Sequence, residues 1–259
     1  MTVVIKFQDV SFVKEQAAIL KDISWQVNAG EHWAILGLNG SGKTTLLKIL
    51  CGYEWPTTGH VTVLGEHFGQ TSIPELRKQI GWVSSALKAR IKGWETAEKI
   101  VLSGKFASIG IYERYSDDDL ATAVQLLADC GGKKLIGSAY NTLSQGQQQL
   151  VLIARALMAD PRVLILDEPC SGLDLFAREE LLETVSRLIE RPHAPTVLYV
   201  THHTEEILPV FNSLLLLRDG KIYAQGSTGK LMNESVLNDF YPEKVRIISQ
   251  GTRQYVIKA

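Results

Sequence analysis

The sequence is poor in cysteine and lacks any long apolar run. Its 259 residues include three cysteines, Cys51, Cys130 and Cys170, and none of them belongs to a CxxC pair. This pattern excludes a disulfide framework and a cysteine-rich zinc site, and it is typical of a reducing cytosol. The richest apolar stretch, SLLLLRDG, is as long as one buried strand, so we expect no membrane-spanning helix. The start, MTVVIKFQDV, is too interrupted for a signal peptide.

The sequence also lacks an excess of charge of either sign. Lysine and arginine number 27, aspartate and glutamate 28, and the formal net charge is -1. Without a basic field we expect no nucleic acid among the partners. Apolar residues make up 45% of the chain, which is enough to build the core of a soluble globular protein.

Alternating and continuous apolar patterns predict the fold class. Short alternating stretches (VVIKFQDVSF, ISWQV and HWAIL) predict strands within the first 36 residues. Beyond residue 162, the apolar runs VLILD, TVLYV and SLLLL are separated by helical patterns. In REELLETVSRLIE the apolar residues of one helical face are Leu181, Leu182, Val185, Leu188 and Ile189. Apolar strands that alternate with amphipathic helices predict an α/β fold with a mostly parallel sheet.

The middle of the chain has a different pattern from its flanks. From residue 89 to 161, helical stretches such as TAEKIVLSGKF and DDDLATAVQLLADCGG replace the β-branched runs. We therefore expect a core of residues 1–88 and 162–235, a helical insertion of residues 89–161, and a C-terminal β extension of residues 236–259. The tail KVRIISQGTRQYVIKA predicts a terminal hairpin that turns near Gln250 and Gly251.

A glycine-rich segment, GLNGSGKT, fits the phosphate-loop pattern GxxxxGK[ST] and lies between a predicted strand and a predicted helix. Glycines let backbone N–H groups curl around a phosphate, and the helix adds its positive end. Lys43 is expected to reach the β and γ phosphates, and Thr44 to bind Mg²⁺. Further nucleotide contacts are expected from Gly37, Asn39, Gly40, Ser41, Gly42 and Thr45. The alternative is a glycine-rich turn that merely precedes a helix.

A second apolar strand, VLILD, delivers acidic residues at its C-terminal end, where ligands bind in parallel sheets. Asp167 is expected to bind Mg²⁺ directly or through water. Glu168 would then act as the general base that aims a water at the γ-phosphate. The alternative for Glu168 is a solvated acid at the end of a strand.

A second helix start of the type that receives anions is predicted at LSQGQQQ, which precedes the apolar run LVLIARAL. The order GLNGSGKTT, LSQGQ, VLILDEP, SGLD and TH resembles the nucleotide-binding subunit of ABC transporters over residues 3–235. The combination is far more specific than the phosphate loop alone. The resemblance implies a P-loop NTPase core with an N-terminal antiparallel β-subdomain and an inserted α-helical subdomain.

In that family two subunits pair head to tail and enclose two ATP molecules. The resemblance therefore implies that Ser144, Gly146 and Gln147 contact the γ-phosphate held by Lys43 of a partner subunit. The alternative is an ordinary helix cap. Asp174 matches a loop that crosses the dimer interface.

Two aromatic or imidazole positions also take roles from the resemblance. Phe12 would stack on adenine, with a core aromatic as the alternative. His202 would hydrogen-bond the γ-phosphate. His203 follows it directly, and because adjacent strand residues point to opposite faces, we expect His203 to be a bystander rather than the second half of a metal pair.

The chain departs from the family pattern at two positions. Ser85 stands where the family has a glutamine that helps to bind Mg²⁺, and the shorter serine side chain favours a bridging water over direct coordination. Gln145 replaces the usual glycine of LSGGQ, and we expect this change to be tolerated because the phosphate contacts fall on the flanking residues. GWVSS and VLSGKF resemble a branch near the molybdate- and iron-chelate-type importers.

The resemblance implies an ATPase, with ATP and Mg²⁺ as cofactors, that drives a separate membrane permease by closing and reopening its dimer. The partner would be a second copy or a related ATPase subunit, and the location cytoplasmic, on the inner face of the cell membrane. The alternative is a soluble ABC-type ATPase that acts on a non-membrane partner. A binding module without turnover is disfavoured because Lys43, Asp167, Glu168 and His202 are all present.

Overall fold

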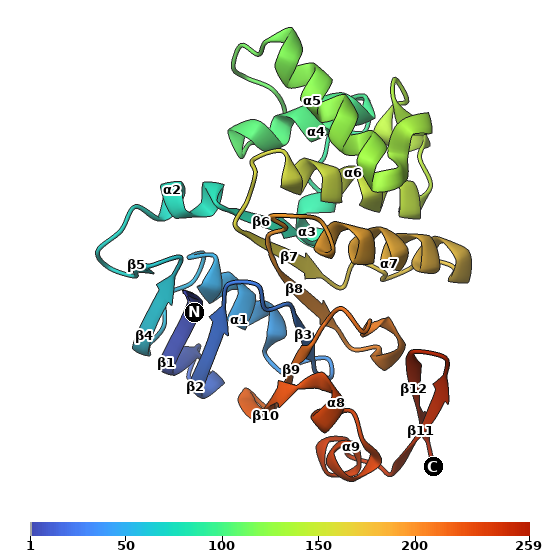
Figure 1. The fold of residues 1–259 in the computed structure, drawn as a ribbon. Helices are drawn as coiled ribbons and strands as arrows, with labels where there is room; N and C mark the ends of the chain where they lie inside the picture. The colour runs from blue at the N-terminus through green and yellow to red at the C-terminus, as the bar shows by residue number, and fades with distance from the viewer. Residues whose placement is uncertain (1) are drawn as a thin grey trace. The chain divides into compact units, whose positions relative to one another are not determined.

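The computed structural model describes residues 2–259, which divide by their internal contacts into two units. Of the described residues, the first unit contains 2–76 and 196–259, and the second contains 77–195. Each unit is described by itself, and its elements are labelled in Figure 1. Within residues 2–259, no helix combines the length and the apolar character needed to cross a lipid bilayer.

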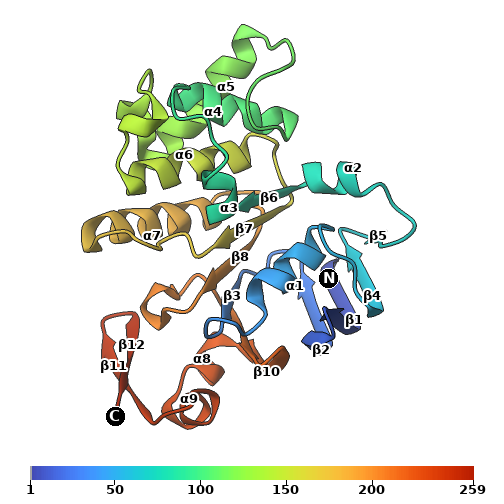
Figure 2. The ribbon, with the colours of Figure 1, turned by 180° about the vertical axis from the view of Figure 1, so that it is seen from behind.

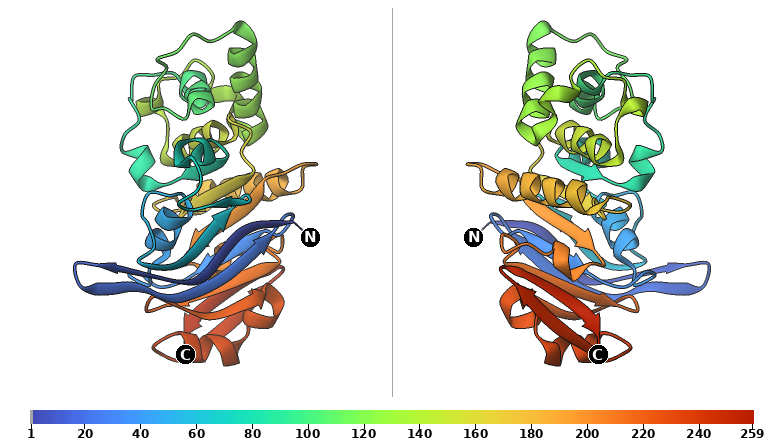
Figure 3. Two further views of the ribbon diagram at one scale, coloured as in Figure 1. Left: turned by 90° about the vertical axis from the view of Figure 1, so that its left-hand side faces the viewer. Right: turned by 90° about the vertical axis from the view of Figure 1, so that its right-hand side faces the viewer.

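The first unit begins with an antiparallel sheet. Its strands are β1 (Val3–Lys14), β2 (Ala17–Asn28), β4 (Thr58–Val63) and β5 (Glu66–His67), in the order β2-β1-β4-β5. Figure 3 shows β1 and β2 as a long twisted ribbon. The alternation in the sequence buries Phe7 and Trp25, whose rings lie 6.1 Å apart. The predicted N-terminal antiparallel strands are therefore confirmed.

A mostly parallel sheet forms the other part of the first unit. Strand β3 (Trp33–Leu36) is fully buried and pairs in parallel with both β8 (Thr196–Thr201) and β9 (Ser213–Arg218). Strand β10 (Lys221–Ser227) pairs antiparallel with β9. Helix α1 (Lys43–Leu50) follows β3 directly and buries four apolar side chains, Leu46, Leu47, Ile49 and Leu50. Strand, loop and helix in this order place the phosphate-loop sequence at the C-terminal end of a central parallel strand.

The chain ends in two short helices and a hairpin, all in the first unit. The helices are α8 (Thr228–Leu231) and α9 (Glu234–Phe240), and the hairpin strands are β11 (Val245–Gln250) and β12 (Arg253–Lys258). The strands pair in register from Val245↔Lys258 to Gln250↔Arg253, as the right-hand view of Figure 3 shows. The predicted terminal hairpin with its turn near Gln250 and Gly251 is confirmed.

The second unit combines a parallel strand pair with helices. Strands β6 (Ile80–Val83) and β7 (Val163–Asp167) pair in parallel. The helices are α3 (Ser85–Lys88), α4 (Ala97–Ser103), α5 (Asp117–Leu127), α6 (Gln145–Leu157) and α7 (Leu175–Ile189), while α2 (Ile73–Lys78) spans the boundary between the units. Figure 2 shows α4, α5 and α6 grouped together, and α4 packs on both others.

The helical character predicted for the middle of the chain is confirmed by α4, α5 and α6. All five residues predicted for the inner face of α7 are buried. The predicted α/β class, with parallel and antiparallel strands covered by helices, is also confirmed. The subdomain boundaries given above stay a prediction.

Candidate functional site

The loop between β3 and α1 has a backbone that only glycine fits at its ends. Gly42 has a φ of 105°, and a Cβ atom there would lie 2.7 Å from Leu20 Cδ2. A Cβ atom at Gly37 would lie 2.5 Å from Ser41 Oγ. The loop is also hydrogen-bonded to the turn between β9 and β10: the N–H of Gly220 donates to the carbonyl of Ser41 (3.1 Å). The loop is therefore a tight, anchored turn.

The groups around this loop fit a phosphate. Lys43 is 6% exposed, and its Nζ donates to the carbonyl oxygens of Gly37 (2.7 Å) and Leu38 (3.1 Å). Ser41 Oγ is buried and has no hydrogen-bond partner. Helix α1 has no side-chain cap and no acidic residue in its first turn. A buried hydroxyl, a folded-in lysine and an uncapped helix start together form a donor set that suits an anion.

Of the other sequence-predicted residues of the first unit, His202 lies near the loop. It and Leu38 line one cleft of about 420 Å³, which the C-terminal hairpin also borders. Tyr241 lines the same cleft, and burial, together with the charge of Glu205, raises the pKa of Tyr241 to about 12.

The prediction that His202 and His203 point to opposite faces was wrong. Strand β8 ends at Thr201, so neither histidine belongs to it. Their ring centroids lie 4.1 Å apart, with the planes tilted by 40°. Strict alternation of side chains holds only inside a strand, and the chain turns immediately after Thr201.

Phe12 lies on β1 opposite Leu20 of β2 and is 7% exposed. That burial matches the alternative of a core aromatic, and adenine stacking by Phe12 stays a prediction. Thr44 is exposed and Thr45 half-buried at the start of α1.

The second unit carries the two predicted acidic residues. Asp167 is the last residue of β7, and Glu168 follows it; both side chains are half-buried. Glu168 has a φ of 49°, in the left-handed region that non-glycine residues seldom adopt. Such backbone strain clusters at functional sites, where the surrounding structure holds it. The observation is consistent with the predicted catalytic role of Glu168, which stays a prediction.

The segment LSQGQ forms a self-contained helix cap at the start of α6. Ser144 Oγ accepts from the N–H of Gln147 (3.3 Å), and Gln147 Oε1 accepts from the N–H of Ser144 (3.0 Å). Both side chains are exposed. The ordinary cap that was the alternative reading of this motif is therefore present, and it leaves both side chains accessible to a partner.

Two further predicted residues of the second unit also lie at helix starts. Asp174 is the N-cap of α7, and its Oδ1 accepts from the N–H of Ala177 (3.0 Å). Ser85 is the exposed first residue of α3, whose cap is the neighbouring Ser84. Within residues 2–259 no group of three or more histidine, cysteine or acidic side chains is placed to hold a metal. Magnesium that arrives with a nucleotide is held largely by phosphates and water and needs only one or two protein carboxylates, so such a group is not required. Thr44, Asp167 and Ser85 stay the predicted ligands.

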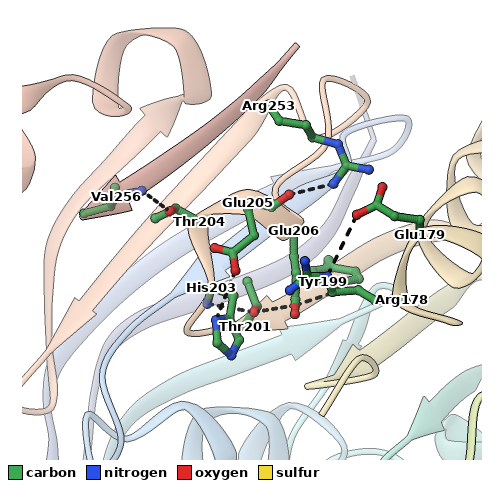
Figure 4. Close-up of polar contacts among 10 residues, drawn as sticks. All are labelled: Arg178, Glu179, Tyr199, Thr201, His203, Thr204, Glu205, Glu206, Arg253 and Val256. Atoms are coloured by element: carbon green, nitrogen blue, oxygen red, sulfur yellow. Dashed lines mark hydrogen bonds and ion pairs between the residues drawn. The ribbon is translucent and has the colours of Figure 1, made fainter. Parts of the chain in front are cut away.

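Sequence reasoning missed a buried acid in the short turn that follows His202 in the chain. Glu206 is 3% exposed, and its Oε2 accepts from the hydroxyl groups of Tyr199 (3.1 Å) and Thr201 (2.6 Å). Figure 4 shows this cluster. The only signal in the sequence is the pair of glutamates in THHTEE, which does not reveal which of them is buried.

Comparison with known proteins identifies the family. A family model described as ABC transporter matches residues 20–171. The ABC transporter ATP-binding protein YmeB of Lactococcus lactis is 46% identical over 256 residues, 99% of each chain. Among solved structures, the chain is similar to a dimeric, post-hydrolysis ATP-binding cassette bound to ADP and Pi, with a TM-score of 0.74 and 25% sequence identity. The match covers 86% of this chain and 98% of the cassette.

Two Escherichia coli relatives are in keeping with the branch that the sequence predicted. The ABC transporter ATP-binding protein ModF is 39% identical over 209 residues, 79% of this chain and 42% of ModF. The ferric enterobactin transport ATP-binding protein FepC is 30% identical over 230 residues, 89% of this chain and 84% of FepC. With the glycine loop, the parallel sheet and the order of the motifs, these matches show that the chain belongs to the ABC transporter family of ATP-binding proteins.

Proposed function

We propose that the chain is the ATP-binding and ATP-hydrolysing subunit of an ABC transporter, and that it drives a separate membrane permease. The observation that carries the proposal is the loop from Gly37 to Gly42: Lys43 Nζ folds back onto the carbonyl of Gly37, and α1 begins after the loop without a side-chain cap. The relatives named above support the nucleotide as ATP. On binding, the phosphates of ATP would replace the carbonyl oxygens of Gly37 and Leu38 as the hydrogen-bond acceptors of Lys43 Nζ.

Each predicted residue has a chemical task in this proposal. Thr44, Asp167 and, through a water, Ser85 would hold Mg²⁺, which would supply positive charge to the phosphates. Glu168 accepts a proton from the attacking water. His202 donates a hydrogen bond to the γ-phosphate, where negative charge develops. None of these steps needs a covalent intermediate with the protein.

The proposed working form is a dimer, either of this chain or of this chain with a related subunit. Support comes from the similarity to a cassette solved as a dimer and from the exposure of Ser144 and Gln147. Each subunit then supplies the start of α6 to the γ-phosphate of its partner. ATP closes the dimer, hydrolysis reopens it, and the permease follows this movement.

Replacement of Glu168 by Gln tests the proposal. The amide cannot accept the proton of water, so ATP still binds but hydrolysis falls by about a hundredfold or more, and ATP holds the dimer closed. Phosphate release and analytical ultracentrifugation at saturating ATP and Mg²⁺ measure the two effects. Glu183→Gln, on the exposed face of α7, is the matched control. A Glu168→Gln variant that hydrolyses ATP at the wild-type rate contradicts the proposal.

The permease is tested separately. Affinity purification from detergent-solubilised membranes should recover a polytopic membrane protein with the tagged chain. Recovery with soluble assemblies alone would favour the alternative, an ABC-type ATPase that acts on a non-membrane partner.

A further inference from the structure

A buried carboxylate hydrogen-bonds the turn that follows His202 to strand β8. Glu206 closes a short 3₁₀ turn (Thr204–Glu206), and its Oε2 accepts hydroxyl hydrogen bonds from Tyr199 and Thr201, both on β8. Both of these residues are buried. Glu206 therefore ties the turn back to the end of the central strand from which it leaves.

The hydroxyl of Thr201 links this carboxylate to the backbone beyond His202. It donates its proton to Glu206 Oε2 (2.6 Å) and accepts from the N–H of His203 (3.0 Å). One hydroxyl can do both, since it has one donor and two acceptor sites. The residues immediately before and after His202 are thus joined through one side-chain oxygen, which restricts the backbone that carries the imidazole.

The C-terminal hairpin holds the same turn from the outside. Arg253 Nη1 donates to the carbonyl of Glu205 (2.6 Å), and the N–H of Val256 donates to Thr204 Oγ1 (3.1 Å). Both contacts come from β12 and are drawn in Figure 4. A segment that lies more than 40 residues further along the chain is therefore attached to each of the first two residues of the turn.

We propose that Glu206 is a positioning residue for His202, and that the C-terminal hairpin supports the other side of the same turn. The inference rests on the proposed function only for what His202 does, namely contact the γ-phosphate. A shift of about 1 Å at such a contact lowers the rate by up to about a hundredfold. Nucleotide affinity depends on the glycine loop instead, so it should be left nearly unchanged.

Two matched pairs of variants test this. Thr201→Val has nearly the same shape but removes the linking hydroxyl, and Thr201→Ser restores it. Glu206→Met removes the acceptor, whereas Glu206→Gln keeps an oxygen that accepts from Thr201. We expect Thr201→Val and Glu206→Met to lower kcat for phosphate release about tenfold with the nucleotide Kd changed less than about twofold. The Ser and Gln variants should stay near the wild-type kcat.

A third pair tests the hairpin. Thr204→Val removes the acceptor for the N–H of Val256, and Thr204→Ser keeps it. We expect the Val variant to lower kcat about threefold and the Ser variant to leave it unchanged. A wild-type kcat in Thr204→Val would contradict the role proposed for the hairpin. A wild-type kcat in both Thr201→Val and Glu206→Met would overturn the positioning role of Glu206. A loss of nucleotide affinity parallel to the loss of kcat would overturn it as well.

A measurement that needs no turnover separates this inference from the proposed function. The imidazole signals of His202 in a ¹⁵N NMR spectrum are assigned from their loss in His202→Asn. In Thr201→Val and Glu206→Met these signals should shift, and in Thr201→Ser and Glu206→Gln they should return to the wild-type position. If the wild-type protein releases no phosphate, the proposed function fails, and unchanged His202 signals in Thr201→Val then overturn the positioning role by themselves.

Discussion

Helices α1 and α6 both begin with a sequence that suits an anion, yet their N-termini are built in opposite ways. Helix α1 follows a glycine loop, has no side-chain cap, and has Lys43 folded onto the loop carbonyls. Helix α6 caps itself, because Ser144 and Gln147 exchange hydrogen bonds with the backbone N–H groups of each other. Before α1, the buried Ser41 Oγ has no hydrogen-bond partner. At the start of α6, by contrast, Ser144 Oγ accepts a hydrogen bond from the N–H of Gln147.

The difference suggests a division of labour between the two starts. A ligand at α1 adds hydrogen bonds without breaking a side-chain cap. A ligand at α6 has to replace or share a capping box, and a cap of this kind is worth about 1 kcal/mol. We therefore expect α1 to bind nucleotide tightly in a single subunit, and α6 to contribute only when a partner brings a phosphate that is already bound.

The largest effect is expected at the α1 start. Lys43→Ala removes the ammonium group that bonds to the loop carbonyls and should weaken ATP binding about a hundredfold, since hydrogen bonds to charged groups are worth roughly 1.5–3 kcal/mol. Calorimetric titration of the single subunit measures it. Lys48→Ala, exposed on the same helix, is the control and should bind normally. Equal affinity in the two variants would refute the assignment of the loop.

A smaller effect is expected on the stability of the loop. Gly42→Ala places a methyl group against Leu20 in a left-handed backbone and should lower the free energy of unfolding by about 2 kcal/mol. Gly40 also has a positive φ, 80°, but no atom lies within 4 Å of the carbon that Gly40→Ala would add. The free energy of unfolding should therefore fall by only about 1 kcal/mol in that variant. Urea denaturation compares them. Identical losses would mean that backbone strain alone accounts for both.

The smallest effect is expected from exchanging one cap for another at α6. Asparagine and aspartate cap a helix as well as serine does. The free energies of unfolding of Ser144→Asn and Ser144→Asp should therefore lie within about 0.5 kcal/mol of the wild-type value. If a partner's γ-phosphate approaches this residue, the added negative charge of Asp should lower phosphate release about tenfold below that of Asn, while single-subunit ATP binding stays normal in both. Thermal unfolding and phosphate release measure this. Equal turnover in the two variants would leave Ser144 as a cap alone.

Much of the fold was predictable because its signals are local. The five apolar residues on one face of α7 are all buried, since helical periodicity alone selects them. The fully buried strand β3 and the glycine loop after it lie next to each other in the sequence, so their geometry follows from a single stretch of chain. The hairpin at residues 245–258 was predictable for the same reason.

The surroundings of His202 were not predictable in this way. The opposite orientation expected for His202 and His203 assumed that the strand continues, but β8 ends at Thr201 and the two rings lie side by side. Burial of Glu206 rather than Glu205 depends on which side of the turn meets Tyr199 and Thr201. A sequence pattern of two adjacent acids carries no information on that choice.

The sequence by itself determined the phosphate loop, the strands and helices around it, and the family, because each depends on residues that are close together in the chain. Only the tertiary structure decided how the turn after His202 is held. There β8 and β12 contribute hydrogen bonds from positions more than 40 residues apart. Hydrogen bonds of this kind form only after the strands have packed, so no local pattern of residues encodes them.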